Sequence, residues 1–246
     1  NIHSLYIATN STRPNKQQLN TSYYMFESSE AHSRFGTHLF TPALSLSLYD
    51  GYSTTHPSSS VQRIYPAAYH TAAKLAATVH NTHQHQSQPH ALYMNFSEMI
   101  RGASYVARDC HNGHPPSNRD QLVLSLRQTG YRVDGLSRCL RSPSLPPGTD
   151  VTLPSVGKMR GMSKYMFHLA FENSIEEGYV TEKAFHALLA GTVPVYLGDS
   201  SHLLSLLPSP SSAIFVSDFR YNMTALAQYL FFLQAHEEEY EKYREW

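Results

Sequence analysis

Residues 165–198 read YMFHLAFENSIEEGYVTEKAFHALLAGTVPVYLG, and this stretch decides the fold that we expect for the chain. Residues 165–171 are largely apolar on both alternating faces, which is typical of a central strand in a parallel sheet. Residues 172–178 then gather three glutamates, an asparagine, a serine and a glycine. Such a run cannot be core, so it predicts a loop at the carboxyl end of the strand.

A helix and a second strand are predicted after this loop. Thr181 stands at the N-cap position, apolar residues recur at helical spacing up to Leu189, and Gly191 ends the helix. Residues 193–197, VPVYL, predict another buried strand, so the stretch forms a βαβ unit. In open α/β sheets ligands bind beyond the carboxyl ends of the strands, where a helix N-terminus favours anions. Because Lys183 adds a positive charge there, we expect a ligand that carries phosphate.

The composition narrows the classes of partner. With 246 residues, of which 41% are hydrophobic, the chain is long enough for one large domain or two small ones. Lys plus Arg equals Asp plus Glu at 19 each, which argues against nucleic acid and against an anionic membrane surface as partners. No run approaches the ~18 to 20 apolar residues of a membrane span. We expect a fragment or trimmed chain, attached to a membrane only through an anchor that lies outside it.

Three strings in this stretch resemble a known family: FENS at 171–174, YVTEK at 179–183 and ALLAGTVPVYLG at 187–198. Together they closely resemble the donor-binding motif of the α1,3-fucosyltransferase family, glycosyltransferase family 10, whose members are inverting enzymes that use GDP-fucose. The resemblance implies an α/β protein of the GT-B type, with two Rossmann-like domains facing a cleft and the donor bound by the C-terminal domain.

The same resemblance implies an activity. The chain is expected to transfer fucose from GDP-fucose to a hydroxyl of a glycan or glycoprotein acceptor, with an α1,3-type linkage to GlcNAc as the first choice. Two alternatives stay open: a catalytically inactive relative that keeps the nucleotide-sugar pocket, and a protein O-fucosyltransferase of the same family. No Asp-x-Asp cluster that would chelate a metal for the diphosphate is visible, so no metal is obligatory, and stimulation by Mn²⁺ is left open.

Residue roles follow from the motif. By resemblance, Asn173 and Lys183 contact the diphosphate, Glu182 contacts the fucose or ribose hydroxyls, and Tyr179 lies at the nucleotide. A physical reason supports these roles, because negative charge builds on the departing β-phosphate oxygen and fixed cations stabilise it selectively in the transition state. The alternative is that Glu182 only favours the helix N-terminus through the dipole, worth ~0.3–1 kcal/mol, and that Tyr179 only packs.

Arg119 is a further donor-site candidate. In the family a strand ends in Ser-Asn-Cys and an arginine that contacts the donor diphosphate begins the next helix. Arg119 fits this arginine, although Arg108 and Asp109 replace Ser-Asn before Cys110. A planar guanidinium suits phosphate oxygens because it can donate two parallel hydrogen bonds. The alternative is an ordinary surface residue in the first turn of a helix.

Glu27 is the candidate general base. It follows a strand-like cluster at 23–26, as the glutamate of a Glu-Ser-Pro motif does in the family, but Ser29 replaces the proline and Glu30 is a nearby competitor. An inverting sugar transfer is a single displacement, which requires a base on the face opposite the leaving group. The alternative is a solvated loop carboxylate.

The histidine-rich segment 80–90, HNTHQHQSQPH, divides the chain in our interpretation. Its irregular spacing and low complexity favour a solvated linker over a metal site. We therefore expect an acceptor-side domain at 1–90, incomplete in this chain, and a Rossmann-like domain that binds GDP-fucose at 91–246.

Cysteines and glycosylation motifs indicate the compartment. Cys110 and Cys139 follow two successive predicted strands, whose ends are commonly neighbours, so a disulfide is favoured over two buried thiols. Sequons occur at Asn10, Asn20, Asn95 and Asn222, although such triplets also arise by chance in a Ser/Thr-rich chain. These features favour the secretory lumen, and the family resemblance implies the Golgi lumen and a type II membrane protein.

Overall fold

The computed structural model describes residues 23–25, 51–53, 92–108, 110, 117–149 and 156–246. The chain divides into two compact units, Asn1–Tyr65 with Glu176–Tyr179, and Pro66–Ile175 with Val180–Trp246. In the first unit the strands β1 (Tyr23–Met25) and β2 (Gly51–Ser53) pair in parallel. Glu27, the histidine-rich segment and the sequons at Asn10 and Asn20 lie outside the described residues, and the predicted domain boundary near residue 90 stays a prediction.

The second unit is built on a parallel sheet with the strand order β4-β3-β5-β6-β7. The strands are β3 (Ile100–Tyr105), β4 (Val133–Gly135), β5 (Tyr165–Phe171), β6 (Val193–Leu197) and β7 (Ile214–Phe215). The α-helices are α4 (Arg119–Gln128), α5 (Val156–Ser163), α6 (Glu182–Leu189), α7 (Ser200–Leu206), α8 (Met223–Ala235) and α9 (Glu237–Glu241). The described residues of this unit also form two 3₁₀ turns, η1 (Phe96–Glu98) and η2 (Val216–Phe219).

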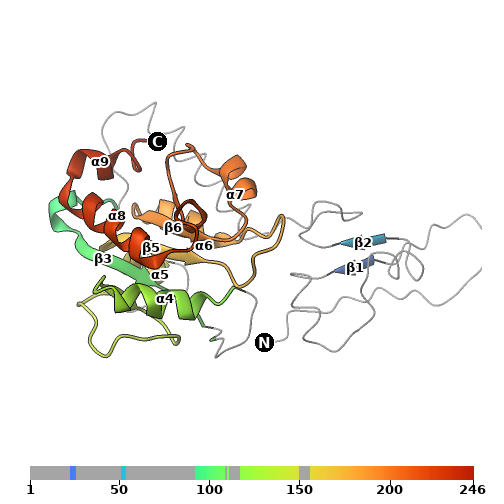
Figure 1. Ribbon diagram of the computed structural model, residues 1–246, viewed down its shortest axis with the longest axis horizontal. Coiled ribbons are helices and arrows are strands. Elements are labelled where there is room, and N and C mark those ends of the chain that lie inside the picture. The colour runs from blue at the N-terminus through green and yellow to red at the C-terminus, as the bar shows by residue number, and fades with distance from the viewer. Residues whose placement is uncertain (1–22, 26–50, 54–91, 109, 111–116, 150–155) are drawn as a thin grey trace, which may run out of the picture. The chain divides into compact units, whose positions relative to one another are not determined.

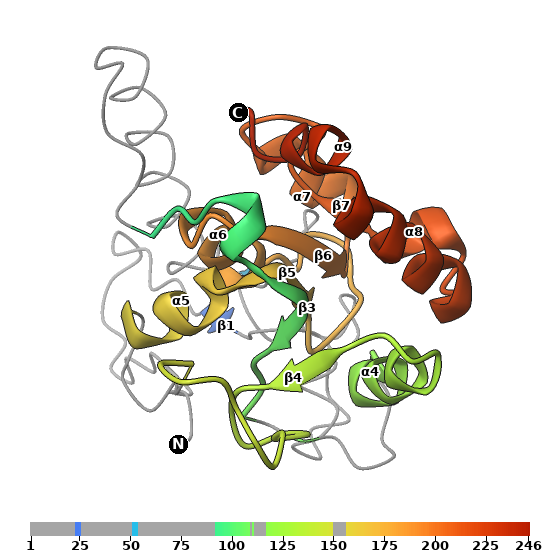
Figure 2. The same cartoon turned by 90° about the vertical axis from the view of Figure 1, so that its left-hand side faces the viewer.

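Helices cover both faces of this sheet (Figure 1). Helices α5 and α6 pack together on one face, and α4 and α8 pack together on the other (Figure 2). A parallel sheet buried by helices on both faces is a doubly wound α/β fold. The predicted α/β class and the Rossmann-like character of the C-terminal part are confirmed, whereas the two-domain GT-B arrangement stays a prediction.

The predicted βαβ unit is present as β5, α6 and β6. Every residue of β5 and of β6 is buried, and the two strands pair in register from Phe167 opposite Val193 to Phe171 opposite Leu197. Helix α6 ends where predicted, since Gly191 takes a left-handed φ of 72° that favours glycine. The two-sided apolar pattern of residues 165–171 is therefore explained by a central strand between two layers of helices.

The direction in which successive strands are added to the sheet reverses once. From β3 the chain crosses through α4 to β4 on one side, and then returns through α5 to β5 on the other side of β3. In doubly wound folds ligands bind outside the carboxyl ends of the strands at such a switch point. The start of α4 and the residues that follow β5 lie at this position.

The predicted disulfide between Cys110 and Cys139 is present, with a Cα–Cα distance of 5.3 Å. It joins the segment after β3 to the segment after β4. Beside it, the Ser137 hydroxyl donates to the carbonyl of Ala107 at 2.7 Å and accepts from its N–H at 2.8 Å. The two segments at the carboxyl ends of neighbouring strands are therefore held together covalently and by hydrogen bonds.

Removal of this bridge is expected to lower stability. The cysteines are 29 residues apart, and a loop of that length gives a chain-entropy contribution of about 3–4 kcal/mol. We expect the Cys110→Ser/Cys139→Ser double variant to unfold at a lower guanidinium concentration, with a free energy of unfolding that is smaller by about 3–4 kcal/mol. Reduction of the unmodified protein should lower its free energy of unfolding by the same amount. Equal unfolding midpoints for the oxidised protein and the double variant would contradict this expectation.

Candidate functional site

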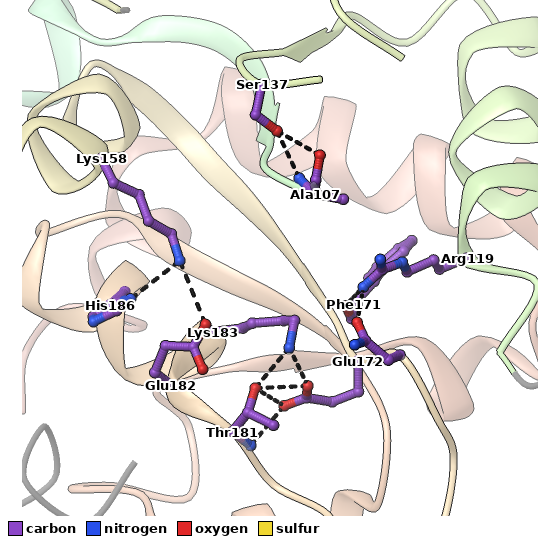
Figure 3. Close-up of polar contacts among 11 residues, drawn as sticks. Ala107, Arg119, Ser137, Lys158, Phe171, Glu172, Thr181, Glu182, Lys183 and His186 are labelled. Carbon is purple, nitrogen blue, oxygen red and sulfur yellow. Dashed lines mark hydrogen bonds and ion pairs between the residues drawn. The ribbon is translucent and has the colours of Figure 1, made fainter. Parts of the chain in front are cut away.

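A buried carboxylate organises the turn between β5 and α6. Glu172, the first residue after β5, has no exposed surface, so the expectation that the run 172–178 lies outside the core is wrong for this residue. Its carboxylate accepts hydrogen bonds from the backbone N–H of Thr181 at 2.8 Å, from the Thr181 hydroxyl at 2.7 Å and from the Lys183 ammonium at 2.6 Å (Figure 3). Because an ionised carboxylate without partners is strongly disfavoured in a protein interior, these donors compensate the burial. Glu172 therefore fixes the N-terminus of α6 against the end of β5.

The neighbouring strand provides the space for Glu172. The N–H of Glu172 donates to the carbonyl of Leu197 at 2.8 Å, which extends the pairing of β5 with β6 by one residue. A Cβ atom at Gly198 would lie 3.0 Å from Cγ of Glu172 and closer still to the hydroxyl of Tyr196. Only glycine fits at this position, which gives a packing reason for the final glycine of the motif.

Lys183 lies in the first turn of α6, as predicted, and its ammonium contacts Glu172 and the Thr181 hydroxyl at 2.7 Å. Its side chain is 13% exposed. An ammonium has three N–H donors. Within the described part of the chain, two of them are directed at side-chain oxygens, one of Glu172 and one of Thr181. A phosphate oxygen can therefore be added to the ammonium without breaking the ion pair.

Arg119 and Asn173 come together at the switch point. Arg119 begins α4 and is only 2% exposed, so the alternative of an ordinary surface residue is wrong. Its Nη1 atom donates to Oδ1 of Asn173 and to the carbonyl of Phe171 at 3.4 Å. A guanidinium at the start of α4 and an amide from the loop after β5 thus meet at the carboxyl end of β5.

Two residues that the sequence analysis missed support this position. The Tyr105 hydroxyl, at the end of β3, donates to Asp120 at 2.6 Å, and the Tyr105 ring packs edge-on against Phe171. Burial raises the pKa of Tyr105, which outweighs the opposite effect of the Arg119 charge, so the phenol remains a donor. Asp120, next to Arg119 in α4, is itself buried. The signal available in the sequence was the carboxylate that directly follows the candidate arginine.

Glu182 lies between two lysines. Its carboxylate is 3.6 Å from the ammonium of Lys158 on α5, and Lys183 is the next residue. Burial alone would raise the pKa of Glu182, but the charges of Lys183 and Lys158 lower it to about 2. The carboxylate is therefore ionised at neutral pH and can accept hydrogen bonds from hydroxyl groups.

Tyr179 belongs to the segment Glu176–Tyr179, which groups with the first unit. The residue is buried, and its N–H closes a turn onto the carbonyl of Glu176 at 3.1 Å. Its predicted contact with a nucleotide stays a prediction. Of the other predicted residues, the structure brings Arg119 to Asn173 and places Glu182 beside Lys183, while Glu27 lies outside the described residues.

The described residues contain neither a metal-ligand cluster nor a candidate membrane span. No set of three or more His, Cys, Asp or Glu side chains in the described ranges is arranged to hold a metal ion. None of the helices in these ranges combines the length and the apolar character that a membrane crossing requires.

The chain is an α/β protein with basic groups at the switch point of a doubly wound sheet. This arrangement is typical of the Rossmann-like class of domains, in which nucleotides bind at the switch point. The model of the family "Glycosyltransferase family 10 (fucosyltransferase) C-term" matches residues 97–246. The chain belongs to this family, and the predicted membership is confirmed.

Similar proteins include the GDP-fucose protein O-fucosyltransferase 3 of Bos taurus and of Danio rerio. The cattle protein is 40% identical over 144 residues, which cover 58% of this chain and 29% of the relative. The zebrafish protein is 29% identical over 251 residues, which cover 93% of this chain and 54% of the relative. The chain thus spans about half or less of these relatives. A crystal structure of an α1,3-fucosyltransferase with GDP is 23% identical, with a TM-score of 0.49, and the match covers 78% of this chain and 51% of that one.

The role of Glu172 can be tested by Glu172→Gln. The amide keeps one acceptor oxygen but removes the charge that compensates Lys183, and hydrogen bonds to charged groups contribute about 1.5–3 kcal/mol. We expect a loss of about 2–3 kcal/mol in the free energy of unfolding, measured by denaturant titration. Glu238→Gln, an exposed carboxylate on α9, is the matched control and should change stability by less than about 0.5 kcal/mol. Identical unfolding curves for Glu172→Gln and the unmodified protein would refute the assigned role.

Proposed function

We propose that the chain transfers fucose from GDP-fucose to an acceptor hydroxyl with inversion at the sugar, and that the turn between β5 and α6 holds the donor diphosphate. The observation that carries this proposal is the placement of Arg119, Asn173 and Lys183 at one edge of the sheet, at the switch point. Family membership and the names of the relatives support fucose and GDP as the donor groups.

The contacts suggest how each residue binds the diphosphate. The Oδ1 atom of Asn173 accepts from Arg119, so its amide nitrogen is the group left to donate to a phosphate oxygen. Arg119 supplies a rigid cation, held in place by its contacts to Asn173 and Phe171. Lys183 adds a second cation beside the N-terminus of α6, where backbone N–H groups also favour an anion. Glu182 accepts from hydroxyls of the fucose or ribose, and Tyr179 packs at the nucleotide.

The reaction is a single displacement. The acceptor oxygen bonds to C1 of fucose, the bond from C1 to the β-phosphate oxygen breaks, and the acceptor proton passes to a base. We assign the base to Glu27, on the resemblance of its segment to the family motif. GDP leaves with one more negative charge than it had in the donor, and the charges of Arg119 and Lys183 stabilise it as it develops.

The acceptor is proposed to be a hydroxyl of a protein. The relatives of cattle and zebrafish are named protein O-fucosyltransferases, which favours this alternative over a glycan acceptor and an α1,3 linkage to GlcNAc. We place the reaction in the secretory lumen, with the Golgi as the expected compartment. The bridge between Cys110 and Cys139 supports an oxidising compartment, because disulfides persist there.

Donor binding is tested by calorimetric titration with GDP. We expect Arg119→Ala and Lys183→Ala to weaken GDP binding by tenfold or more, since a charge-assisted contact contributes roughly 1.5–3 kcal/mol. Arg138→Ala and Lys242→Ala, which remove exposed cations elsewhere in the unit, are the matched controls and should bind GDP as the unmodified protein does. No heat of binding from the unmodified protein would contradict the proposal.

Catalysis is tested with radiolabelled GDP-fucose and the full-length protein, offered folded protein domains and GlcNAc-containing glycans separately. We expect label in the protein acceptors, and we expect Glu27→Gln to abolish transfer while GDP affinity is unchanged. Glu30→Gln is the matched control, and loss of transfer in this variant alone would move the base to Glu30. Label only in the glycans would correct the acceptor, and GDP binding without any transfer would support the inactive relative.

A further inference from the structure

We propose that Lys158 is a positioning residue of the donor site: its ammonium supplies the counter-charge that lets the Glu182 carboxylate lie next to an anionic diphosphate. This inference rests on the proposed function. Lys158 lies on α5, thirteen residues before the donor motif begins at Phe171, and neither the motif nor the family resemblance points to it.

The contacts of Lys158 are directed at the first turn of α6. Its ammonium is 3.6 Å from Oε1 of Glu182 and 3.2 Å from Nδ1 of His186. Only 18% of the side chain is exposed, so the charge is largely removed from water. Figure 3 shows the Lys158 ammonium pointing from α5 toward Glu182 and His186, whereas the Lys183 ammonium points toward Glu172 and Thr181.

The four charged groups at the start of α6 form two ion pairs. Lys183 pairs with Glu172, and Lys158 pairs with Glu182. With Lys158 the four groups sum to zero charge, since two lysines oppose two glutamates. Without Lys158 the remaining three sum to a charge of −1, and a diphosphate would then approach an uncompensated carboxylate.

The two histidines near Lys158 do not change the sum of charges at the start of α6. Burial lowers the pKa of Lys158, and the charge of Glu182 acts in the opposite direction. His186 presents Nδ1 to the ammonium, so this nitrogen accepts and the ring is neutral in this arrangement. His168, fully buried and bonded to the Ser104 hydroxyl, has a pKa well below its usual value because of burial first and the nearby charge of Lys158 next. His168 therefore adds no charge at neutral pH, and His186 adds none while its Nδ1 accepts from Lys158.

A purely structural role for Lys158, which would only attach α5 to α6, makes a different prediction. A structural defect caused by Lys158→Met would not be repaired by a second substitution that removes the Glu182 charge. A charge defect would be repaired, because Lys158→Met with Glu182→Gln again leaves one lysine opposite one glutamate. This comparison is a double-mutant cycle between two side chains in contact.

The test is calorimetric titration of GDP into the unmodified protein and five variants at fixed salt, including Glu182→Gln alone, which completes the cycle. We expect Lys158→Met to weaken GDP binding by roughly tenfold, the size expected for one partly buried charge close to the ligand. Lys158→Arg should bind within about threefold of the unmodified protein, because the cation is kept. Arg160→Met, which removes an exposed cation on the same helix, should have no effect. Lys158→Met/Glu182→Gln should bind GDP within about threefold of Glu182→Gln alone, because loss of Lys158 has little effect once the Glu182 charge is removed.

Each outcome decides between the interpretations. GDP binding by Lys158→Met equal to that of the unmodified protein, or the same loss of affinity from Lys158→Met with and without Glu182→Gln, would overturn the inference while the proposed function stands. No binding by the unmodified protein would instead overturn the proposed function. Thermal unfolding of each variant without ligand identifies a folding defect. Should Lys158→Met be unfolded, Lys158→Gln, which removes the charge but keeps a hydrogen-bonding group, replaces it with the same expected result.

Discussion

The burial of the Glu172 carboxylate is the constraint on which the site depends. A charge with no exposed surface is tolerated only where donors surround it, and here these are the N–H and hydroxyl of Thr181 and the ammonium of Lys183. The same contacts bring together the end of β5 and the beginning of α6. The helix N-terminus, with its free N–H groups, is thereby fixed at the carboxyl edge of the sheet, where an anion is best bound.

The rest of the unit brings a second cation to the same edge. The order of strands places β3 next to β5, and the helix that follows β3 begins with the buried Arg119. The disulfide from Cys110 to Cys139 joins the segments that follow β3 and β4 at this edge. Asn173, two residues after the end of β5, accepts from the arginine. The sheet topology and this polar contact thus combine to orient the guanidinium.

The sequence predicts the βαβ unit well because its two strands are buried on both faces and its helix has clear end signals at Thr181 and Gly191. The disulfide was predictable for a similar reason, since two cysteines follow successive strands. The partners of Lys183 and Glu182 were not predictable. Glu172 precedes Lys183 by eleven residues across a loop, and Lys158 reaches Glu182 only because α5 and α6 pack on one face of the sheet. Such contacts depend on tertiary packing, which local patterns do not encode.

We propose that the turn between β5 and α6 binds the diphosphate of a nucleotide sugar. The most direct measurement is a crystal structure of the chain with GDP. We expect phosphate oxygens within hydrogen-bonding distance of the Arg119 guanidinium and the Lys183 ammonium, with Glu172 still accepting a hydrogen bond from the N–H of Thr181. A diphosphate bound elsewhere, with both cations keeping only their present protein partners, would contradict it.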